Sequence, residues 1–357
     1  MAKNLFDAVY GSLIAGAVGD ALGAPVEGMQ YNEIREKYGK MTDLINNPVY
    51  YTNHMPGAVT DDTQMRHIIC KAIADKQGRI LPAEMAKAMM EKLNPEKVWI
   101  SDVLALERLK CGISEWESGK GAIPCGCASM GIAPAGIINA GDPEQAYQDG
   151  YCLASVHNTG ENVEFAASFA AAQAAAFLPD VTQDAIIKVI YRYSTDIVRR
   201  AFDLTMDIAY GCSDLDQFTE KFYDKMLDWT WPLRPGTWNK HKFFSGNSRE
   251  FMPVVFAIMH YTPELNQALI DGASFGRDCD TISSMVGNIA GTIAGASALR
   301  QDWIEQCTKA NEDMFIYVDG DAKCDFADMA RRLVKSLENE RSKAEMRAHW
   351  LGKVLKY

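Results

Sequence analysis

Two short acidic motifs, far apart in the chain, constrain the fold more than any other feature of the sequence. The first reads Gly-Ala-Val-Thr-Asp-Asp-Thr over residues 57–63, and the second reads Phe-Gly-Arg-Asp-Cys-Asp-Thr over residues 275–281. Each follows a glycine-containing turn and opens an apolar helical segment. Together they offer four carboxylates and two hydroxyls, a set of oxygen ligands that suits a hard divalent cation. A shared site requires both ends of the chain in one core, which predicts a single domain over residues 1–357.

Each motif alone also has a simpler interpretation. Thr60 and Asp278 stand where helix N-cap residues stand, and acidic residues in a first turn favour the helix dipole. The two motifs together favour a metal site, because carboxylates crowded at the start of apolar helices repel one another unless a cation neutralises them.

Most of the remaining chain shows helical periodicity. Residues 4–22 place Leu5, Val9 and Leu13 on one face, with small residues beside them that let another backbone come close: Gly11, Ala15 and Gly19. Comparable patterns predict helices from Asp61, over 82–93, from Pro143, over 164–177, as one or two helices over 182–210, and over 250–260, 264–274, 281–299, 300–312 and 324–341. No convincing alternating run stands between turn signals. The prediction is an all-α fold, a compact multi-helix bundle.

Three segments are predicted to be irregular. Residues 28–59 are dense in Gly, Pro, Asn and Thr, and residues 110–131 carry five glycines. Glycine lets a backbone approach a ligand closely, although a plain surface loop is the commoner interpretation of 119–131. Residues 228–246 hold three tryptophans among basic residues, which suits either local packing or stacking on a base or sugar.

Composition narrows the functional class. A formal net charge of −11 argues against nonspecific nucleic-acid binding, which needs a positive surface. The nine cysteines are odd in number and mostly lie in apolar segments, which predicts reduced thiols in a cytoplasmic protein. The first residues do not read as a signal peptide, and no apolar run is long enough to predict a membrane span. We therefore expect neither a nucleic-acid nor a membrane partner.

The motifs resemble those of the ADP-ribosylglycohydrolase superfamily. The resemblance rests on Gly-Asp-Ala-Leu-Gly at 19–23 with Glu27 following, on Thr-Asp-Asp-Thr at 60–63, and on Gly-Arg-Asp-Cys-Asp-Thr at 276–281 before a Gly/Ala helix. It implies an all-helical fold with two Mg²⁺ or Mn²⁺ ions. By position, it implies six metal ligands: Thr60, Asp61, Asp62, Asp278, Asp280 and Thr281.

The resemblance also implies substrate-binding residues. Glu27 matches an acidic residue near the metals that gates or assists substrate binding in some members, and His157 matches a ribose-side histidine. A phosphate-contacting loop falls on Gly126, Cys127, Ala128, Ser129 and Met130. The family loop often reads Gly-Asn-Gly, two small residues, then Met-Arg, and here Gly126 and Gly131 occupy the Asn and Arg positions. These departures weaken the expectation of a full ADP-ribose diphosphate.

The expected activity is a metal-dependent hydrolysis of a ribosyl glycosidic bond, with Glu27, Asp62 and Asp280 as catalytic residues. One of the aspartates or Glu27 takes the proton, and the sequence leaves that base unassigned. The leading substrate is an ADP-ribosylated protein side chain or small molecule. Two alternatives stay open: a smaller nucleoside-like N-glycoside, or a noncatalytic relative that binds a nucleotide. The acceptor, the native metal and the oligomeric state also stay open.

Overall fold

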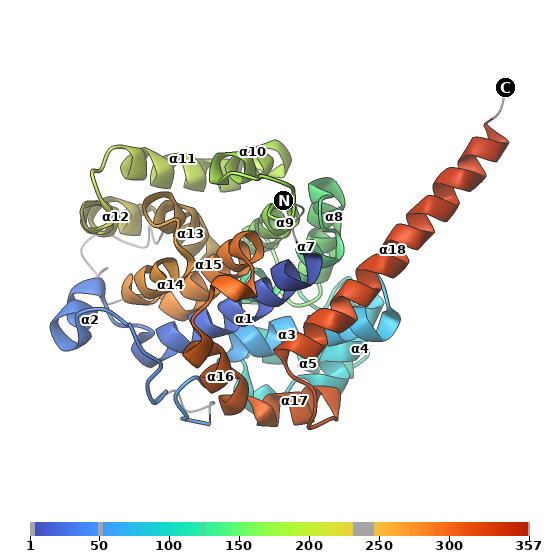
Figure 1. Cartoon of the computed structure of the whole chain (residues 1–357), viewed down its shortest axis with the longest axis horizontal. Helices are drawn as coiled ribbons and strands as arrows, with labels where there is room; N and C mark the ends of the chain where they lie inside the picture. The colour runs from blue at the N-terminus through green and yellow to red at the C-terminus, as the bar shows by residue number, and fades with distance from the viewer. Residues whose placement is uncertain (1–3, 49–52, 124, 231–245, 356–357) are drawn as a thin grey trace.

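The structure is a computed structural model that describes residues 4–48, 53–123, 125–230 and 246–355 (Figure 1). These residues form α-helices joined by short 3₁₀ turns and loops, and among them the one β-type contact is an isolated bridge between Gln30 and Gly276. The helices are α1 (Leu5–Gly23), α2 (Tyr31–Tyr38), α3 (Asp61–Lys76), α4 (Pro82–Lys92), α5 (Ile100–Lys110), α6 (Cys127–Gly131), α7 (Ala133–Ile138), α8 (Pro143–Ala154), α9 (Glu161–Ala175), α10 (Gln183–Tyr193), α11 (Asp196–Tyr210), α12 (Leu215–Thr230), α13 (Ser248–Tyr261), α14 (Leu265–Ser274), α15 (Cys279–Ala294), α16 (Gln301–Ala310), α17 (Glu312–Asp319) and α18 (Phe326–Val354). The all-α prediction is confirmed.

Helices α1 and α15 pack against each other at the centre of the molecule (Figure 1). Their backbones nearly touch, because a Cβ atom built on Gly19 would lie 2.2 Å from the carbonyl oxygen of Ser283, and one built on Gly287 would lie 2.2 Å from that of Ala15. Any side chain at these two positions would force the helices apart. The small-residue face predicted for residues 4–22 is therefore the contact face of the central pair.

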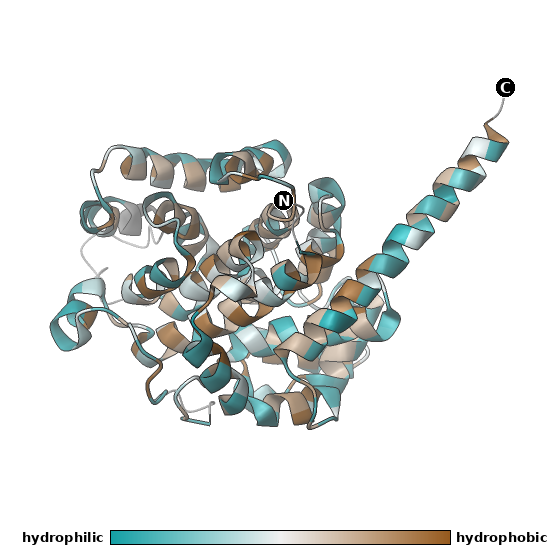
Figure 2. Ribbon diagram, in the orientation of Figure 1, coloured by the Kyte–Doolittle hydropathy of each residue, from teal (hydrophilic) through white to brown (hydrophobic). Residues whose placement is uncertain are grey.

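Further helices enclose this pair. Helices α13 and α14 pack on α15, α18 packs on α1, and α3 contacts α6, α7 and α18. Helix α9, rich in alanine, is buried on nearly all sides as predicted. Figure 2 shows the resulting pattern, with hydrophobic ribbon segments inside and hydrophilic ones on the outer helices. The core is thus built around the two helices whose ends carry or approach the acidic motifs.

Several predicted boundaries were wrong. The irregular connection 28–59 contains α2, and the glycine-rich segment 110–131 ends in the short helix α6. Helices α5, α12 and α17 were not predicted, and α18 runs well past residue 341. The tryptophan-rich segment 228–246 begins inside α12, and its residues 231–245 lie outside the described part of the chain.

Helix α1 and the turn after it, Leu5–Val26, are long and apolar enough by composition to cross a membrane. In this structure 78% of that apolar window is buried inside the protein. The apolar character of the segment is accounted for by its contacts with α15, α14 and α18.

Candidate metal centre

The first acidic motif caps helix α3. Thr60 has an extended backbone, and its hydroxyl accepts a hydrogen bond from the Asp62 N–H at 3.3 Å. The buried carboxylate of Asp20 on α1 accepts from the N–H groups of Thr60 and Thr63, at 3.0 and 3.1 Å. Asp20 thereby fixes the backbone of the motif, and Asp61 and Asp62 line the pocket described below.

The second motif begins helix α15, with Asp278 at the N-cap position. Arg277, just before it, has a left-handed backbone conformation with φ of 61°, which non-glycine residues seldom adopt. Its backbone is fixed by the turn after α1, since Arg277 N–H donates to Met29 and its carbonyl accepts from Gly28. Its buried guanidinium pairs with Glu250 on α13. This pairing of loops brings Glu27, next to Gly28, beside Asp278.

The two motifs and Glu27 meet at one pocket. Its lining residues come from six separate parts of the chain: Glu27, Asp61, Asp62, Trp99, Cys125, Gly126, Cys127, Met130, Gly246, Asp278, Asp280 and Thr281. One carboxylate oxygen each from Glu27, Asp278 and Asp280 lies within 4.8 Å of the other two. Of the six predicted metal ligands, five line the pocket. The sixth, Thr60, is fully buried behind it with its hydroxyl engaged in the cap.

Among the described residues, the carboxylates of the pocket are buried together and repel one another. Burial, followed by the charges of Asp278 and Asp61, raises the pKa of Glu27 to about 8. Burial and then Asp102 raise the pKa of Asp61 to about 7. Burial, with Asp280 as the next cause, raises the pKa of both Asp62 and Asp278 well above the usual range. Without a cation, burial and mutual repulsion therefore favour the protonated forms of these carboxylates.

The same residues fit a divalent cation. Asp62 Oδ2 and Asp280 Oδ1 are buried and have no hydrogen-bond partner among the described residues. A buried polar atom without a partner is costly, and a cation would satisfy both atoms. All the candidate donors of the two motifs are hard oxygens, the ligand type that Mg²⁺ and Mn²⁺ prefer.

Buried residues behind the pocket join the helices that carry it. Arg66 on α3 donates to the Thr63 hydroxyl at 3.0 Å and to the Ser284 hydroxyl on α15 at 2.8 Å. Asp61 in turn accepts from the backbone N–H of Trp99 at 3.0 Å. Sequence reasoning gave no role to Asp20, Arg66 or Trp99. Two signals were available for Asp20: its place in the Gly-Asp-Ala-Leu-Gly motif at 19–23, and a carboxylate late in a largely apolar helix.

The predicted phosphate-contacting loop is only partly at the pocket. Gly126, Cys127 and Met130 line it, whereas Ala128 and Ser129 are buried behind it, and the Ser129 hydroxyl lies 2.9 Å from that of Ser248. The two positions that depart from the family pattern have no room for a side chain. A Cβ on Gly126 would lie 2.3 Å from the Phe251 ring, and one on Gly131 would lie 2.8 Å from Met65.

Two thiols form part of the pocket wall. Cys125 and Cys127 share a hydrogen bond with their sulfurs 3.1 Å apart. That hydrogen bond lowers the pKa of Cys125 to about 7 and raises the pKa of Cys127 well above its usual range. Cys125 is therefore the readier nucleophile of the pair.

His157 is not among the residues that line the pocket. Its ring is fully buried, and Nδ1 lies 2.6 Å from Asp102 Oδ1. Nε2 has no hydrogen-bond partner among the described residues. The predicted contact of His157 with a ribose stays a prediction, and in this structure the residue orients Asp102, whose charge acts on Asp61.

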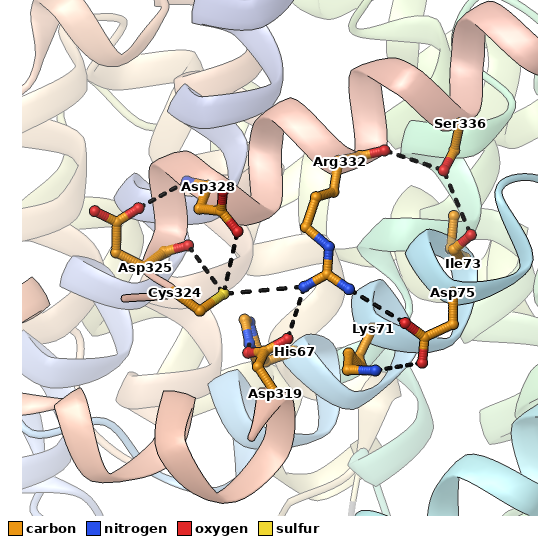
Figure 3. Close-up of polar contacts among 10 residues, drawn as sticks. All are labelled: His67, Lys71, Ile73, Asp75, Asp319, Cys324, Asp325, Asp328, Arg332 and Ser336. Carbon is orange, nitrogen blue, oxygen red and sulfur yellow. Dashed lines mark hydrogen bonds and ion pairs between the residues drawn. The ribbon is translucent and has the colours of Figure 1, made fainter. Parts of the chain in front are cut away.

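A second group of metal-type side chains lies elsewhere, between α3 and the C-terminal helices. His67, Asp319 and Cys324 have ligand atoms within 4.8 Å of one another. Figure 3 shows why this group is satisfied as it stands: Asp319 binds His67 at 2.6 Å and Arg332 at 2.9 Å. The guanidinium already supplies the positive charge that a metal would bring. We interpret this cluster as a structural ion-pair network.

Comparison with known proteins decides the family. A family profile described as ADP-ribosylglycohydrolase matches residues 1–343, nearly the whole chain. The chain belongs to the ADP-ribosylglycohydrolase family. A solved structure titled "ADP-ribosylglycohydrolase-related protein complex" shares its fold, with a TM-score of 0.68 over 93% of this chain and 99% of that chain at 16% identity. Family and fold together place the chain among ADP-ribosylglycohydrolase-type hydrolases.

Sequence relatives of this ADP-ribosylglycohydrolase-family chain are distant. An uncharacterized protein of Archaeoglobus fulgidus is 26% identical over 298 residues, covering 81% of this chain and 88% of that protein. The uncharacterized protein YegU of Escherichia coli is 22% identical over 316 residues, covering 82% and 89%. The ADP-ribosyl-[dinitrogen reductase] glycohydrolase of Rhodospirillum rubrum is 29% identical over 148 residues, covering 39% and 47%.

Proposed function

We propose that this chain is a metal-dependent hydrolase that cleaves a ribosyl glycosidic bond, with ADP-ribose on a side chain or small molecule as its leading substrate. The observation that carries the proposal is the pocket in which the two acidic motifs and Glu27 converge, where Asp62 and Asp280 each have a carboxylate oxygen with no partner among the described residues. Family membership supports the reaction class. The unpartnered oxygens also weigh against a noncatalytic relative, which has no need of a costly set of buried carboxylates.

The carboxylates would divide the work. Two divalent cations would be held by four carboxylates, those of Asp61, Asp62, Asp278 and Asp280. When bound, these cations would activate a water molecule and bind the ribose diol. Glu27 lies at the rim of this group and is the least buried of the pocket carboxylates. With a pKa near 8 in the metal-free pocket, Glu27 is suited to hold a proton for the leaving group or to receive one from water.

Trp99 would bind the part of the substrate that reaches the mouth of the pocket. Its side chain lines the pocket and is 44% exposed, while its backbone N–H is fixed on Asp61. An exposed indole beside a polar reaction centre suits stacking on a base or a sugar face. In this arrangement the ring would order the substrate relative to the carboxylates.

A second candidate substrate is a smaller ribosyl N-glycoside. Gly126 and Gly131 remove two side chains that the family loop often offers to a diphosphate, and Phe251 and Met65 fill the space where such side chains would begin. The site therefore has fewer donors for a diphosphate than the family pattern provides. A nucleoside or a ribosylated small molecule does not need those donors.

The test is a substrate panel assayed with Mg²⁺ or Mn²⁺: peptides ADP-ribosylated on arginine or serine, small ADP-ribose derivatives, and nucleosides. We expect release of ADP-ribose or ribose from at least one class, and a loss of about a hundredfold or more in Asp278→Asn. Asp302→Asn, an exposed carboxylate outside the pocket, is the matched control. Absence of metal-dependent hydrolysis across the panel, or full activity in Asp278→Asn, contradicts the proposal.

A further inference from the structure

The wall of the acidic pocket contains a pair of thiols that the proposed hydrolysis does not use. Cys125 and Cys127 both line the pocket, on either side of Gly126. Their sulfurs lie 3.1 Å apart and share a hydrogen bond. All nine cysteines of the chain are free thiols, so this pair is present in its reduced form. Two thiols in such close contact can undergo chemistry that the neighbouring carboxylates cannot.

The backbone places the two cysteines at a distance that a disulfide can span. Disulfides join Cα atoms about 4.4–6.8 Å apart. Gly126, the residue between the cysteines, has φ of −75° and ψ of 0°, in the right-handed helical region. A residue in that region leaves the Cα atoms of its two neighbours about 5.4 Å apart. The sulfurs would therefore have to approach by only about 1 Å to reach the bonded distance of about 2.0 Å.

The loop between the two cysteines is held in place. The Gly126 N–H donates to the carbonyl oxygen of Gly246, and a Cβ atom on Gly126 would lie 2.3 Å from the Phe251 ring. The approach of the sulfurs would then fall on the side-chain torsions of the two cysteines. A disulfide closed across a single fixed residue would be strained, and strained disulfides are easily reduced. Bond formation at this position would therefore be reversible.

The two thiols are not equivalent. The Asn158 side-chain amide donates to the Cys125 carbonyl oxygen at 3.0 Å and lies 3.8 Å from the Cys125 sulfur. The hydrogen bond with Cys127 lowers the pKa of Cys125 to about 7 and raises the pKa of Cys127. Since the thiolate is the attacking form of a cysteine, Cys125 reacts first and Cys127 is the thiol that follows.

We propose that Cys125 and Cys127 are a reversible oxidation site, at which a hydroperoxide converts the thiol pair into a disulfide in the wall of the acidic pocket. The Cys125 thiolate attacks one oxygen of hydrogen peroxide, an S–O bond forms, the O–O bond breaks and hydroxide leaves. The Cys127 sulfur then attacks the resulting sulfenic acid, an S–S bond forms, and the hydroxyl leaves with the Cys127 proton as water. The two thiols lose two electrons, and the peroxide is reduced to water.

The disulfide would form in the wall that faces the acidic motifs. Cys127 is the first residue of α6, and Met130 of the same helix also lines the pocket. Joining the two sulfurs would draw this wall toward Cys125 and change the space that is left for a ligand. One consequence rests on the proposed hydrolase function: the oxidised protein should hydrolyse its substrate more slowly, and reduction by a dithiol should restore the rate.

The test exposes the full chain to hydrogen peroxide near stoichiometric amounts, alkylates the remaining thiols and measures the mass of the protein and its peptides. We expect the loss of two of the nine thiols, a product lighter by two hydrogen atoms, and a bond mapped to Cys125 and Cys127. Dithiothreitol should restore both thiols. A wild-type protein that keeps both thiols under peroxide that oxidises the exposed Cys111 overturns the proposal.

Variants separate the two roles. Cys127→Ser should stop at a sulfenic acid on Cys125, which dimedone traps. Cys125→Ser should slow the oxidation of Cys127 about tenfold or more, because the attacking thiolate is gone. Cys111→Ser removes an exposed thiol outside the pocket and is the matched control, which should form the disulfide as the wild type does. Oxidation of Cys127 at the wild-type rate in Cys125→Ser overturns the assignment of the nucleophile.

Hydrolysis by the same wild-type samples, reduced, oxidised and reduced again, tests the consequence separately, because thiol loss is measured without substrate. Equal rates in the reduced and oxidised samples overturn the consequence. A reduced sample without hydrolysis contradicts the proposed function and the consequence with it, while the thiol measurement still decides whether the pair is an oxidation site.

Discussion

Among single residues, Asp20 shows how a buried carboxylate can set the geometry of a site without lining it. Its oxygens accept from the backbone of Thr60 and Thr63, and the Thr63 hydroxyl in turn accepts from Arg66. Burial, as the largest cause, raises the pKa of Asp20, although these hydrogen bonds oppose that rise. Asp20 is therefore a positioning residue for the first acidic motif.

Asp20→Asn tests that role. The amide would place donors where the loop needs acceptors, so the first motif should shift. We expect a loss of about 10–100-fold in metal affinity, the range typical of residues that orient metal ligands, with the helical content retained. Metal titration followed by calorimetry measures the affinity. Unchanged affinity in a folded Asp20→Asn variant would show that the loop holds its own shape.

The raised pKa values of the pocket carboxylates predict how stability depends on pH. Glu27 and Asp61 hold protons more tightly in the folded than in the unfolded chain, with pKa values of about 8 and 7. Their contribution to stability is present below their ordinary pKa values and is lost as the pH rises through the folded values. The Tm of metal-free protein should therefore fall between about pH 5 and about pH 8.

Scanning calorimetry in a chelator, with and without excess Mn²⁺, measures this fall. Mn²⁺ should raise the Tm more at the upper end of the pH range, because the ionised carboxylates then gain a cation. Glu27→Gln should flatten the pH profile of the metal-free protein, since one titrating group is removed. A Tm that rises with pH in the chelator would contradict the pKa assignments.

The sequence predicted much of the site at this scale. The residues of both acidic motifs could be named because several carboxylates crowded at the starts of apolar helices repel one another without a cation, and five of the six predicted ligands line one pocket. Trp99 and Asp102 could not be named, because each reaches the site through a contact between segments distant in sequence. Metal ligation by the residues of the two acidic motifs stays a prediction.

At the scale of elements, the close contact of α1 and α15 decides where the second motif stands. A Cβ atom on Gly23, at the end of α1, would lie 2.4 Å from the backbone nitrogen of Asp280. The glycines of both helices let the end of one approach the start of the other. Periodicity in the sequence showed which helices have a face of small residues, but it could not show which two of these faces pack together.

Gly287→Ala tests this packing away from the pocket. The added methyl would lie 2.2 Å from the Ala15 carbonyl oxygen. Because the contact is with backbone, the two helices would have to move apart to accommodate it. We expect destabilisation of about 3 kcal/mol or more, measured by urea denaturation. Gly352→Ala in α18 is the control, since no heavy atom lies within 4 Å and the change should be neutral or slightly stabilising. Equal stability of the two variants would contradict the close contact.

Element boundaries were predicted less well than element type. Helix α2 was hidden because its single buried residue, Ile34, gives almost no apolar periodicity. The end of α18 was missed because its residues after Glu340 are rich in charge and almost all exposed. Both cases show that periodicity detects a helix through its burial, and that weakly buried helices escape it.

At the scale of the whole molecule, the acidic pocket exists because distant parts of the chain meet around the central helices. The turn after α1, the start of α3, the loop before α5, the segment at α6 and the start of α15 all contribute to its lining. The sequence predicted that the two acidic motifs share one site, because their carboxylates together suit a divalent cation. The organisation of residues 1–357 as one domain, and a cytoplasmic location, stay predictions.

The most direct test of the central claim is electron paramagnetic resonance of Mn²⁺ titrated into the purified protein. We predict two bound ions per chain with a spectrum broadened by coupling between them, and loss of that coupling in Asp62→Asn and in Asp280→Asn. An uncoupled spectrum in the wild-type protein, or a coupled one that survives both substitutions, would contradict the assignment of this pocket as a two-metal centre.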